Sequence, residues 1–190
     1  MSLEAASEQV QMLQALENRK REQISRKAQQ EEIIYQQWAT FRVDHELYGV
    51  DVMQVKEVLR FSEITPVPGA AASVLGIINL RGNVVTVIDT RQLFRISPAQ
   101  PDDETRIIVV ELNESEVIGL VVDSVDEVIN LPQNEVDRAP NASNTSNDEN
   151  SQRFVQGVCY HHEMLIILLD LGRMLASITP PTAENSPGPH

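Results

Sequence analysis

The chain has 190 residues, enough for one domain or for two small halves that share a core. Its formal net charge of −13 argues against nucleic acid as the main partner, because phosphate neutralisation requires a basic face. The longest apolar runs, such as residues 164–169, are too short to span a bilayer, and polar residues from Ser2 onward argue against a signal peptide. A single cysteine, Cys159, excludes an internal disulfide and suits a reducing compartment. We therefore expect a soluble, cytoplasmic protein.

Residues 3 to about 36 contain neither Gly nor Pro and are rich in helix formers, which predicts one long helix. The first half of this helix carries an apolar stripe at Leu3, Val10, Leu13 and Leu16. Between positions 17 and 32 only Ile24 and Ala28 are apolar, so no heptad seam is sustained. We assign residues 1–37 to an N-terminal helical extension. It is either solvated and loosely docked, or it pairs with a partner or with a second copy of the chain.

From Trp38 onward the sequence consists of short β-type runs separated by turn residues. The predicted strand regions lie at residues 38–43, 47–52, 55–61, 74–94, 105–112, 116–125, 126–131 and 164–171. Residues 141–153 are polar and low in complexity, which predicts a mobile loop. The Pro-rich tail at 179–190 is expected to be disordered.

The most informative feature of the sequence is an internal repeat. Residues 48–59, YGVDVMQVKEVL, align with residues 118–129, IGLVVDSVDEVI. Residues 76–94 align in the same order with residues 157–175. The matched pairs include Gly49 with Gly119, Val55 with Val125, Gly76 with Gly157 and Asp89 with Asp170.

Two copies of one β-rich unit, covering about 38–96 and 104–178, explain these matches. Small units of short strands close best as barrels, because closure removes exposed sheet edges. The short apolar segments that end the copies, at 91–94 and 172–176, are expected to form helical turns that plug the barrels. The predicted fold class is mainly β, with two barrels from an internal duplication, a long N-terminal helix and short helical segments.

Comparison of the two copies separates residues that the fold needs from residues that are free for function. Arg81 and Gly82 of the first copy become His162 and Glu163 in the second, while the flanking strands keep their character. The fold itself therefore does not require Arg81. Because Gly82 and Asn83 already form a turn signal, Arg81 is either a solvated turn residue or a contact with a partner.

The stretches LYGVDVMQVKEV, VLGIINLRGNVVTVIDTR and VIGLVVDSVDEV follow one another along the chain. Any one of these motifs alone is weak, but the set is specific. Together they resemble the CheW coupling proteins of bacterial chemotaxis in sequence, order and spacing. The resemblance covers about residues 38–178, which we assign as one CheW-like domain.

This resemblance implies two five-stranded, SH3-like β-barrels packed around a shared hydrophobic seam. It also implies an adaptor that is not an enzyme and needs no cofactor. Its implied partners are the cytoplasmic tip of a methyl-accepting chemoreceptor and the regulatory domain of the histidine kinase CheA, which has the same fold. No nucleic acid and no membrane insertion are implied, and the protein would lie in the cytoplasm at chemoreceptor arrays.

In the family, the Asn-Leu-Arg-Gly turn lies by the groove between the barrels, where the helical hairpin of the receptor docks. An apolar groove with one arginine suits the recognition of a helix. Kinase binding is expected on the barrel faces away from this groove. Carried over to matching positions, the resemblance implies a partner-binding set of Val55, Glu57, Gly76, Asn79, Leu80, Arg81 and Val85.

The chain departs from the usual family pattern in three places. The long N-terminal helix is extra, which indicates a specialised array or a non-flagellar pathway, such as pilus motility or second-messenger control. Residues 85–87 read Val-Thr-Val where a proline is common. Residues 136–143, VDRAPNAS, lack the bulky aromatic that some members carry there for a second contact, which puts ring-forming contacts with other couplers in doubt.

The sequence contains no Gly-rich phosphate loop, no Gly-x-Ser-x-Gly and no His-Glu-x-x-His motif. His161 and His162 are adjacent, so their side chains point to opposite faces and are not expected to bind a metal. Cys159 is expected to be a small buried hydrophobe.

A remote alternative function, an acidic β-barrel hydrolase, requires two carboxylates that converge in a pocket. The candidate carboxylates each follow apolar strand residues and are Asp51, Asp89, Asp123 and Asp170. Since Asp89 and Asp170 recur in both copies, hydrogen bonding to the backbone at strand ends is the favoured interpretation.

Overall fold

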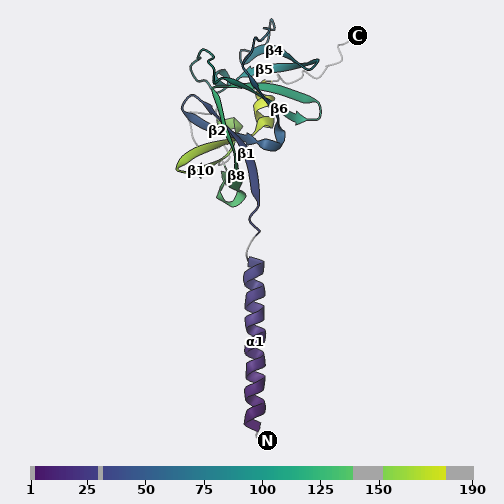
Figure 1. Ribbon diagram of the computed structural model, residues 1–190, viewed down its shortest axis with the longest axis vertical. Helices are drawn as coiled ribbons and strands as arrows, with labels where there is room; N and C mark the ends of the chain where they lie inside the picture. Colours follow the sequence, from purple (N-terminus) through teal and green to yellow (C-terminus); the bar gives the residue numbers. More distant parts are fainter. Residues whose placement is uncertain (1–2, 30–31, 139–151, 179–190) are drawn as a thin grey trace, which may run out of the picture. The chain divides into compact units, whose positions relative to one another are not determined.

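The computed structural model describes residues 3–29, 32–138 and 152–178. The chain divides into two compact units, Met1–Ile34 and Tyr35–His190 (Figure 1). The predicted loop lies outside the described residues up to position 151, as does the predicted tail at 179–190. The second half of the stretch VDRAPNAS, from position 139, also lies outside them.

The first unit contains the helix α1, Leu3–Gln29. Its end at Gln29 corrects the prediction of a helix to about residue 36, and strand β1 already begins at Tyr35. The cause is the cluster of Ile33, Ile34 and Tyr35, because β-branched and aromatic side chains lose rotamer freedom in a helix. No described helix is long and apolar enough to cross a membrane.

The second unit contains two β-sheets (Figure 1). The sheet that carries the candidate site, here called sheet B, has the order β3 (Val55–Arg60), β6 (Arg106–Asn113), β7 (Glu116–Val122), β5 (Asn83–Asp89), β4 (Val74–Leu80). Sheet A has the order β8 (Ser124–Pro132), β1 (Tyr35–Val43), β2 (Glu46–Asp51), β11 (Met164–Leu169), β10 (Val155–His161), β9 (Asp137–Arg138).

Both sheets close on themselves in the same way. In sheet A, the chain leaves β8 through the 3₁₀ helix Gln133–Glu135 and returns as β9, which pairs with β10 at the other end of the sheet. In sheet B, Thr65 follows β3 and forms a bridge with Ile77 of β4, with backbone N···O distances of 2.9 and 2.8 Å. Closure leaves few unpaired strand edges, and the two predicted SH3-like barrels are thereby confirmed. Sheet B has the five strands expected, whereas sheet A has six, because the two-residue strand β9 is added to it.

Strand pairing confirms the internal repeat, position by position. Gly49 lies in the second strand of the β1–β2 hairpin and pairs in parallel with Leu168, two residues before Asp170. Gly119 lies in the second strand of the β6–β7 hairpin and pairs in parallel with Val87, two residues before Asp89. A register shift occurs at Gly76 in β4 and at Gly157 in β10. The matched residues therefore occupy equivalent topological positions.

The two repeats nevertheless do not form one barrel each. The hairpin β1–β2 of the first repeat pairs with β8 and β11 of the second, and the hairpin β6–β7 of the second pairs with β3 and β5 of the first. The expectation that each repeat closes its own barrel is therefore wrong. The parallel pairs β2–β11 and β5–β7 join strands that are distant in the chain, so the repeat pattern alone does not reveal them.

Short helices cap the barrels and share one central core. Asp89 accepts hydrogen bonds from the backbone N–H groups of Arg91 and Gln92 at the start of α2, Thr90–Leu93. Asp170 accepts one from the backbone N–H of Arg173 in α3, Leu171–Ile178. The predicted role of these aspartates in strand-end hydrogen bonding is confirmed. The core between the barrels includes buried residues of both sheets, among them Phe41, Tyr48, Ile108, Leu120, Phe154 and Met174.

Arg91 joins the two barrels through a set of ion pairs that we call the Arg91 junction. Its Nε donates to Asp123 Oδ1 at 2.9 Å and its Nη2 donates to Asp123 Oδ2 at 2.6 Å. Nη2 also lies 3.4 Å from Asp44 Oδ1 in the β1–β2 turn, and Nη1 donates to the Ser97 carbonyl at 2.6 Å. Only 15% of the Arg91 side chain is exposed. The junction therefore ties α2 to the β1–β2 hairpin of the other barrel.

Candidate functional site

The candidate site begins at the two-residue turn between β4 and β5. Arg81 and Gly82 both have positive φ, 51° and 84°, as a type I′ hairpin turn requires. Asn79 Oδ1 accepts a hydrogen bond from the Gly82 N–H at 3.0 Å, which satisfies the backbone of the turn. The turn thus holds Arg81 at the edge of sheet B with its side chain 77% exposed.

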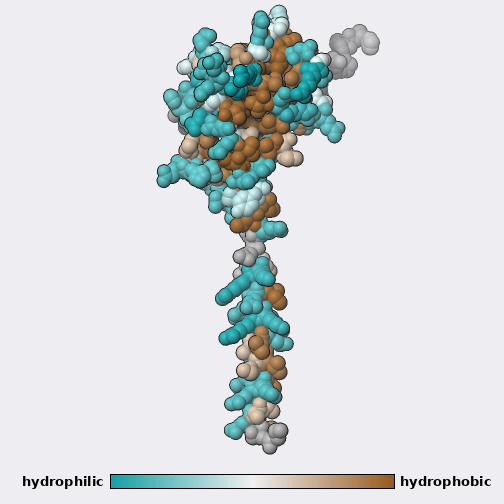
Figure 2. Space-filling model, viewed as in Figure 1, coloured by the Kyte–Doolittle hydropathy of each residue, from teal (hydrophilic) through white to brown (hydrophobic). Residues whose placement is uncertain are grey.

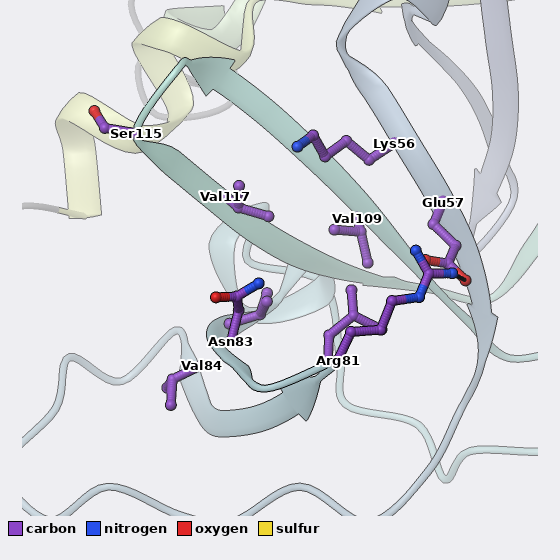
Figure 3. A pocket seen from close by; sticks show the side chains of 10 residues that line it. Lys56, Glu57, Arg81, Asn83, Val84, Val109, Ser115 and Val117 are labelled. Atoms are coloured by element: carbon purple, nitrogen blue, oxygen red, sulfur yellow. Dashed lines mark hydrogen bonds and ion pairs between the residues drawn. The ribbon is translucent and has the colours of Figure 1, made fainter.

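Beside this turn lies a groove of about 550 Å³ in the surface of sheet B (Figure 3). Residues of β3, of the β4–β5 hairpin and of the β6–β7 hairpin line it. Figure 3 shows Lys56 and Glu57 on one side, Arg81, Asn83 and Val84 on the other. The full lining is Lys56, Glu57, Leu80, Arg81, Asn83, Val84, Val85, Val109, Ser115 and Val117.

The groove combines an apolar floor with a polar rim. Val85 and Val109 are buried, so they form the floor, and Val117 is half-buried beside them. Val84 stands at the rim with 67% of its side chain exposed. On the face of the β-rich unit seen in Figure 2, hydrophobic side chains gather in a band that hydrophilic ones border. The apolar side chains that the groove exposes are Val84 and, in part, Leu80 and Val117. An exposed apolar surface with a polar border is typical of an interaction site.

The charged residues of the rim are paired within the chain. Arg81 Nη2 lies 3.1 Å from Glu57 Oε1, across the groove edge between β4–β5 and β3. Lys56 Nζ lies 3.0 Å from Glu111 Oε2. Pairs as exposed as these contribute at most about 1 kcal/mol to stability, so their side chains are available to rearrange on a partner. The sequence did not predict either pair.

Four of the seven predicted partner-binding residues line this groove: Glu57, Leu80, Arg81 and Val85. The other three have structural positions outside it. Val55 packs against the core between the barrels. Gly76 is buried with φ of 151°, and a Cβ there would collide with the Thr65 carbonyl at the bridge that closes the barrel. Asn79 is exposed and supports the turn.

The groove beside Arg81 takes its lining from the strands and hairpins of sheet B alone, so it is a different place from the groove between the barrels in which the receptor was expected to dock. The place where the receptor docks stays a prediction. Six lining residues were missed: Lys56, Asn83, Val84, Val109, Ser115 and Val117. Val109, Ser115 and Val117 belong to the second repeat and reach the site because the β6–β7 hairpin pairs with strands of the first. Lys56, Asn83 and Val84 lie beside or close to predicted partner-binding residues in the sequence, and this closeness is the signal that could have indicated them.

The four candidate aspartates do not form a paired carboxylate site. Asp89 and Asp170 cap helices, Asp51 caps a short 3₁₀ helix by accepting from the Met53 N–H, and Asp123 belongs to the Arg91 junction. Burial alone would raise the pKa of Asp123, but the hydrogen bonds from Arg91 and from the Asp44 N–H lower it below its ordinary value. A general acid needs the opposite shift.

The remaining candidate groups show no catalytic arrangement. Cys159 is buried, and burial raises the pKa of its thiol, which disfavours the nucleophilic thiolate. Residues 3–29, 32–138 and 152–178 contain no cluster of three His, Cys, Asp or Glu side chains suited to a metal. What this surface offers is a groove for binding, with an apolar floor and a charged rim.

The fold of the second unit is similar to that of known proteins. The family model of the CheW-like domain matches residues 37–179. A chemotaxis protein CheW from Klebsiella aerogenes is 30% identical over 146 residues, covering 77% of this chain and 85% of that protein. Chemotaxis protein CheW from Bacillus subtilis is 34% identical over 116 residues, covering 61% and 74%. The crystal structure of the scaffolding protein TtCheW from Thermoanaerobacter tengcongensis matches with a TM-score of 0.64 and 34% identity, covering 72% of this chain and 90% of that one. The chain belongs to the CheW-like family.

Proposed function

We propose that this protein is a non-enzymatic adaptor of bacterial chemotaxis that couples the cytoplasmic tip of a chemoreceptor to the regulatory domain of the histidine kinase CheA. The names of its relatives support a role in chemotaxis, and one relative of known crystal structure is described as a scaffolding protein. The protein would act in the cytoplasm, at chemoreceptor arrays.

The observation that carries this proposal is the groove of sheet B. A helical hairpin presents apolar side chains along one face, and the exposed Val84 with the half-buried Leu80 and Val117 of the groove offers apolar contacts to such a face. The rim offers Arg81 to a carboxylate or to carbonyls at a helix end, and Glu57 to a cation. Because Arg81 and Glu57 form a solvated ion pair with each other on the surface, docking exchanges that pair for contacts between each side chain and the receptor.

Kinase binding belongs, in this proposal, to barrel faces away from the groove. An adaptor must hold two partners at once, so their contacts cannot share one groove. The helix α1 carries its apolar stripe at Leu3, Val10, Leu13 and Leu16 and is a second candidate surface, for self-association or for another partner.

The experiment that tests the receptor site is Arg81→Asp. Aspartate tolerates the positive φ of this turn, and the lost ion pair with Glu57 is exposed, so stability should fall by no more than about 1 kcal/mol. Receptor affinity should fall by roughly 2–5 kcal/mol if Arg81 meets a desolvated partner group, which is about thirtyfold to several thousandfold.

The matched control is Arg153→Asp, which changes the net charge equally at an exposed position in the 3₁₀ helix before β10. Receptor-tip fragments and kinase regulatory domain are titrated separately against each variant. Arg81→Asp should weaken receptor binding and leave kinase binding nearly unchanged, and Arg153→Asp should change receptor binding little. A folded Arg81→Asp variant with wild-type receptor affinity would remove Arg81 from the site.

A further inference from the structure

The helix α1 exposes apolar side chains along one side. Residues three and four positions apart share one face of a helix, and on α1 this spacing gives a line of residues that we call the seam. The seam consists of Leu3, Ala6, Val10, Leu13, Glu17, Lys20, Ile24 and Lys27. Its large apolar members are exposed, from 53% at Val10 to 92% at Leu3. Most helical stability in proteins comes from packing of such a face, so a partner that covers the seam would stabilise α1.

The charges of α1 are divided between its two halves. Residues 3–17 carry three acidic side chains and no basic one, whereas residues 18–29 carry five basic side chains and one acidic one. The helix dipole explains only part of this division, because its effect is confined to the first and last turns. Glu17 and the basic run 19–21 lie in the middle of the helix, outside both turns. The division fits a partner whose charges run in the opposite order along the helix.

A second copy of α1 in antiparallel orientation is such a partner. When the pair is centred between residues 18 and 19, the two helices overlap from residue 8 to residue 29, over about 33 Å. Opposite charges then meet in the middle of the seam, and apolar side chains pack on either side of them. The aliphatic stem of Lys27 covers Val10 while its ammonium group stays in water. The facing pairs, each of which occurs twice, are Glu17 with Lys20, Leu13 with Ile24, and Val10 with Lys27.

A parallel pair of the same helices would place each seam residue against its own copy. Glu17 would face Glu17 and Lys20 would face Lys20, and like charges in facing positions are destabilising. These charged residues are the reason that the sequence lacks a sustained apolar heptad seam. In the antiparallel pair the same residues select the orientation and the register, as polar residues at seam positions do in other coiled coils.

We propose that α1 pairs with α1 of a second copy of this chain, in antiparallel orientation and centred between residues 18 and 19. The pair is expected to be reversible, because only Leu13 and Ile24 form wholly apolar contacts across it. Since the CheW-like domain follows the C-terminal end of α1, the two domains leave the pair at opposite ends, and α1 thereby links two copies of the protein. The proposal does not depend on the groove of sheet B or on the identity of the receptor.

The first test is sedimentation velocity of the full chain and of charge variants. The variant Glu17→Lys places lysine against Lys20 twice and should weaken the pair about tenfold or more. The double exchange of Glu17→Lys with Lys20→Glu restores opposite charges and should recover wild-type association. The control Glu22→Lys makes the same change of charge on the other side of the helix and should change association little. Glutamate and lysine have similar helix propensity, so α1 itself is retained in every variant.

Two results of this test would overturn the proposal. One is a wild-type chain that stays monomeric at about 100 µM, a concentration at which even a weak helix pair is populated. The other is a double exchange that associates no better than Glu17→Lys alone.

The second test determines the orientation from the distance between nitroxide labels on the two copies. Cys159 is buried, so an added cysteine on exposed α1 reacts selectively, at Ser7→Cys or at Asn18→Cys. Residue 7 lies between eleven and twelve residues from the centre of the pair, so its two labels should be about 35 Å apart along the axis. A parallel pair would bring them within about 20 Å, whereas labels at residue 18 should be that close in either orientation. A short distance at Ser7→Cys, or a long one at Asn18→Cys, would contradict the antiparallel assignment.

Discussion

Replacing Arg91 by methionine tests whether the Arg91 junction holds the two barrels together. Methionine keeps most of the length of the side chain and removes the guanidinium, so Asp123 loses both hydrogen bonds from it and Asp44 loses its ion pair. Breaking one partner out of a buried ion pair costs about 3–5 kcal/mol, because the other charge stays buried without compensation.

The structure places the expected cost below the top of that range. The Asp123 side chain is 33% exposed and still accepts a hydrogen bond from the Asp44 N–H, so its carboxylate is partly solvated in the variant. We therefore expect Arg91→Met to lower the free energy of unfolding by about 2–3 kcal/mol. Lys56→Met is the matched control, because its ion pair with Glu111 is exposed and should contribute under about 1 kcal/mol.

The assay is urea unfolding followed by fluorescence of Trp38, the single tryptophan of the chain, which is buried. Combining Arg91→Met with Asp123→Asn completes a double-mutant cycle, and the two effects should be strongly non-additive because both residues belong to one network. If Arg91→Met costs no more than Lys56→Met, the junction is an ordinary surface pair and does not join the barrels.

Three further outcomes follow from the fold. Gly76→Ala should unfold the protein or cost more than about 4 kcal/mol, since its Cβ meets the backbone at the barrel closure; circular dichroism checks this, and a native-like melting temperature would contradict it. The contribution of ionised Asp123 to the free energy of unfolding should be fully present above the unfolded-state pKa of an aspartate, about 3.9, and should be lost as the pH falls through the lower pKa of folded Asp123. Acid unfolding checks this, and an identical acid transition in Arg91→Met would contradict it. Residues 35–96 and 97–178, expressed apart, should each be unfolded and should fold when mixed, because each barrel needs strands from both; a folded isolated half would refute strand exchange.

Local features of this fold could be predicted from sequence because they depend on nearby residues. The turn after Leu80 followed from the Gly82-Asn83 turn signal, and the short helices after Asp89 and Asp170 followed from the apolar segments 91–94 and 172–176 that end the two copies. The limit of α1 was placed too late, because the helix-forming composition up to Gln29 outweighed the β-branched residues that follow it.

Features that depend on distant strands could not be predicted in the same way. A repeat gives the same sequence pattern whether each copy closes its own barrel or exchanges hairpins with the other. The exchange brings Val109 and Val117 to the groove, and it brings Asp123 to Arg91, so both the site and the junction escaped prediction. The Arg81–Glu57 ion pair escaped for a similar reason, since it joins two strands that are not neighbours in sheet B.

The central claim is that the receptor tip docks in the groove of sheet B, and cross-linking at one residue tests it most directly. A photoreactive benzophenone amino acid is placed at Val84, which is 67% exposed at the groove rim. The control carries it at Tyr160 of sheet A, which is 68% exposed and outside the groove. With receptor-tip fragments, Val84 should form a covalent adduct at high yield and Tyr160 should form little. Equal yields at both positions, or an adduct from Tyr160 alone, would show that the receptor docks elsewhere.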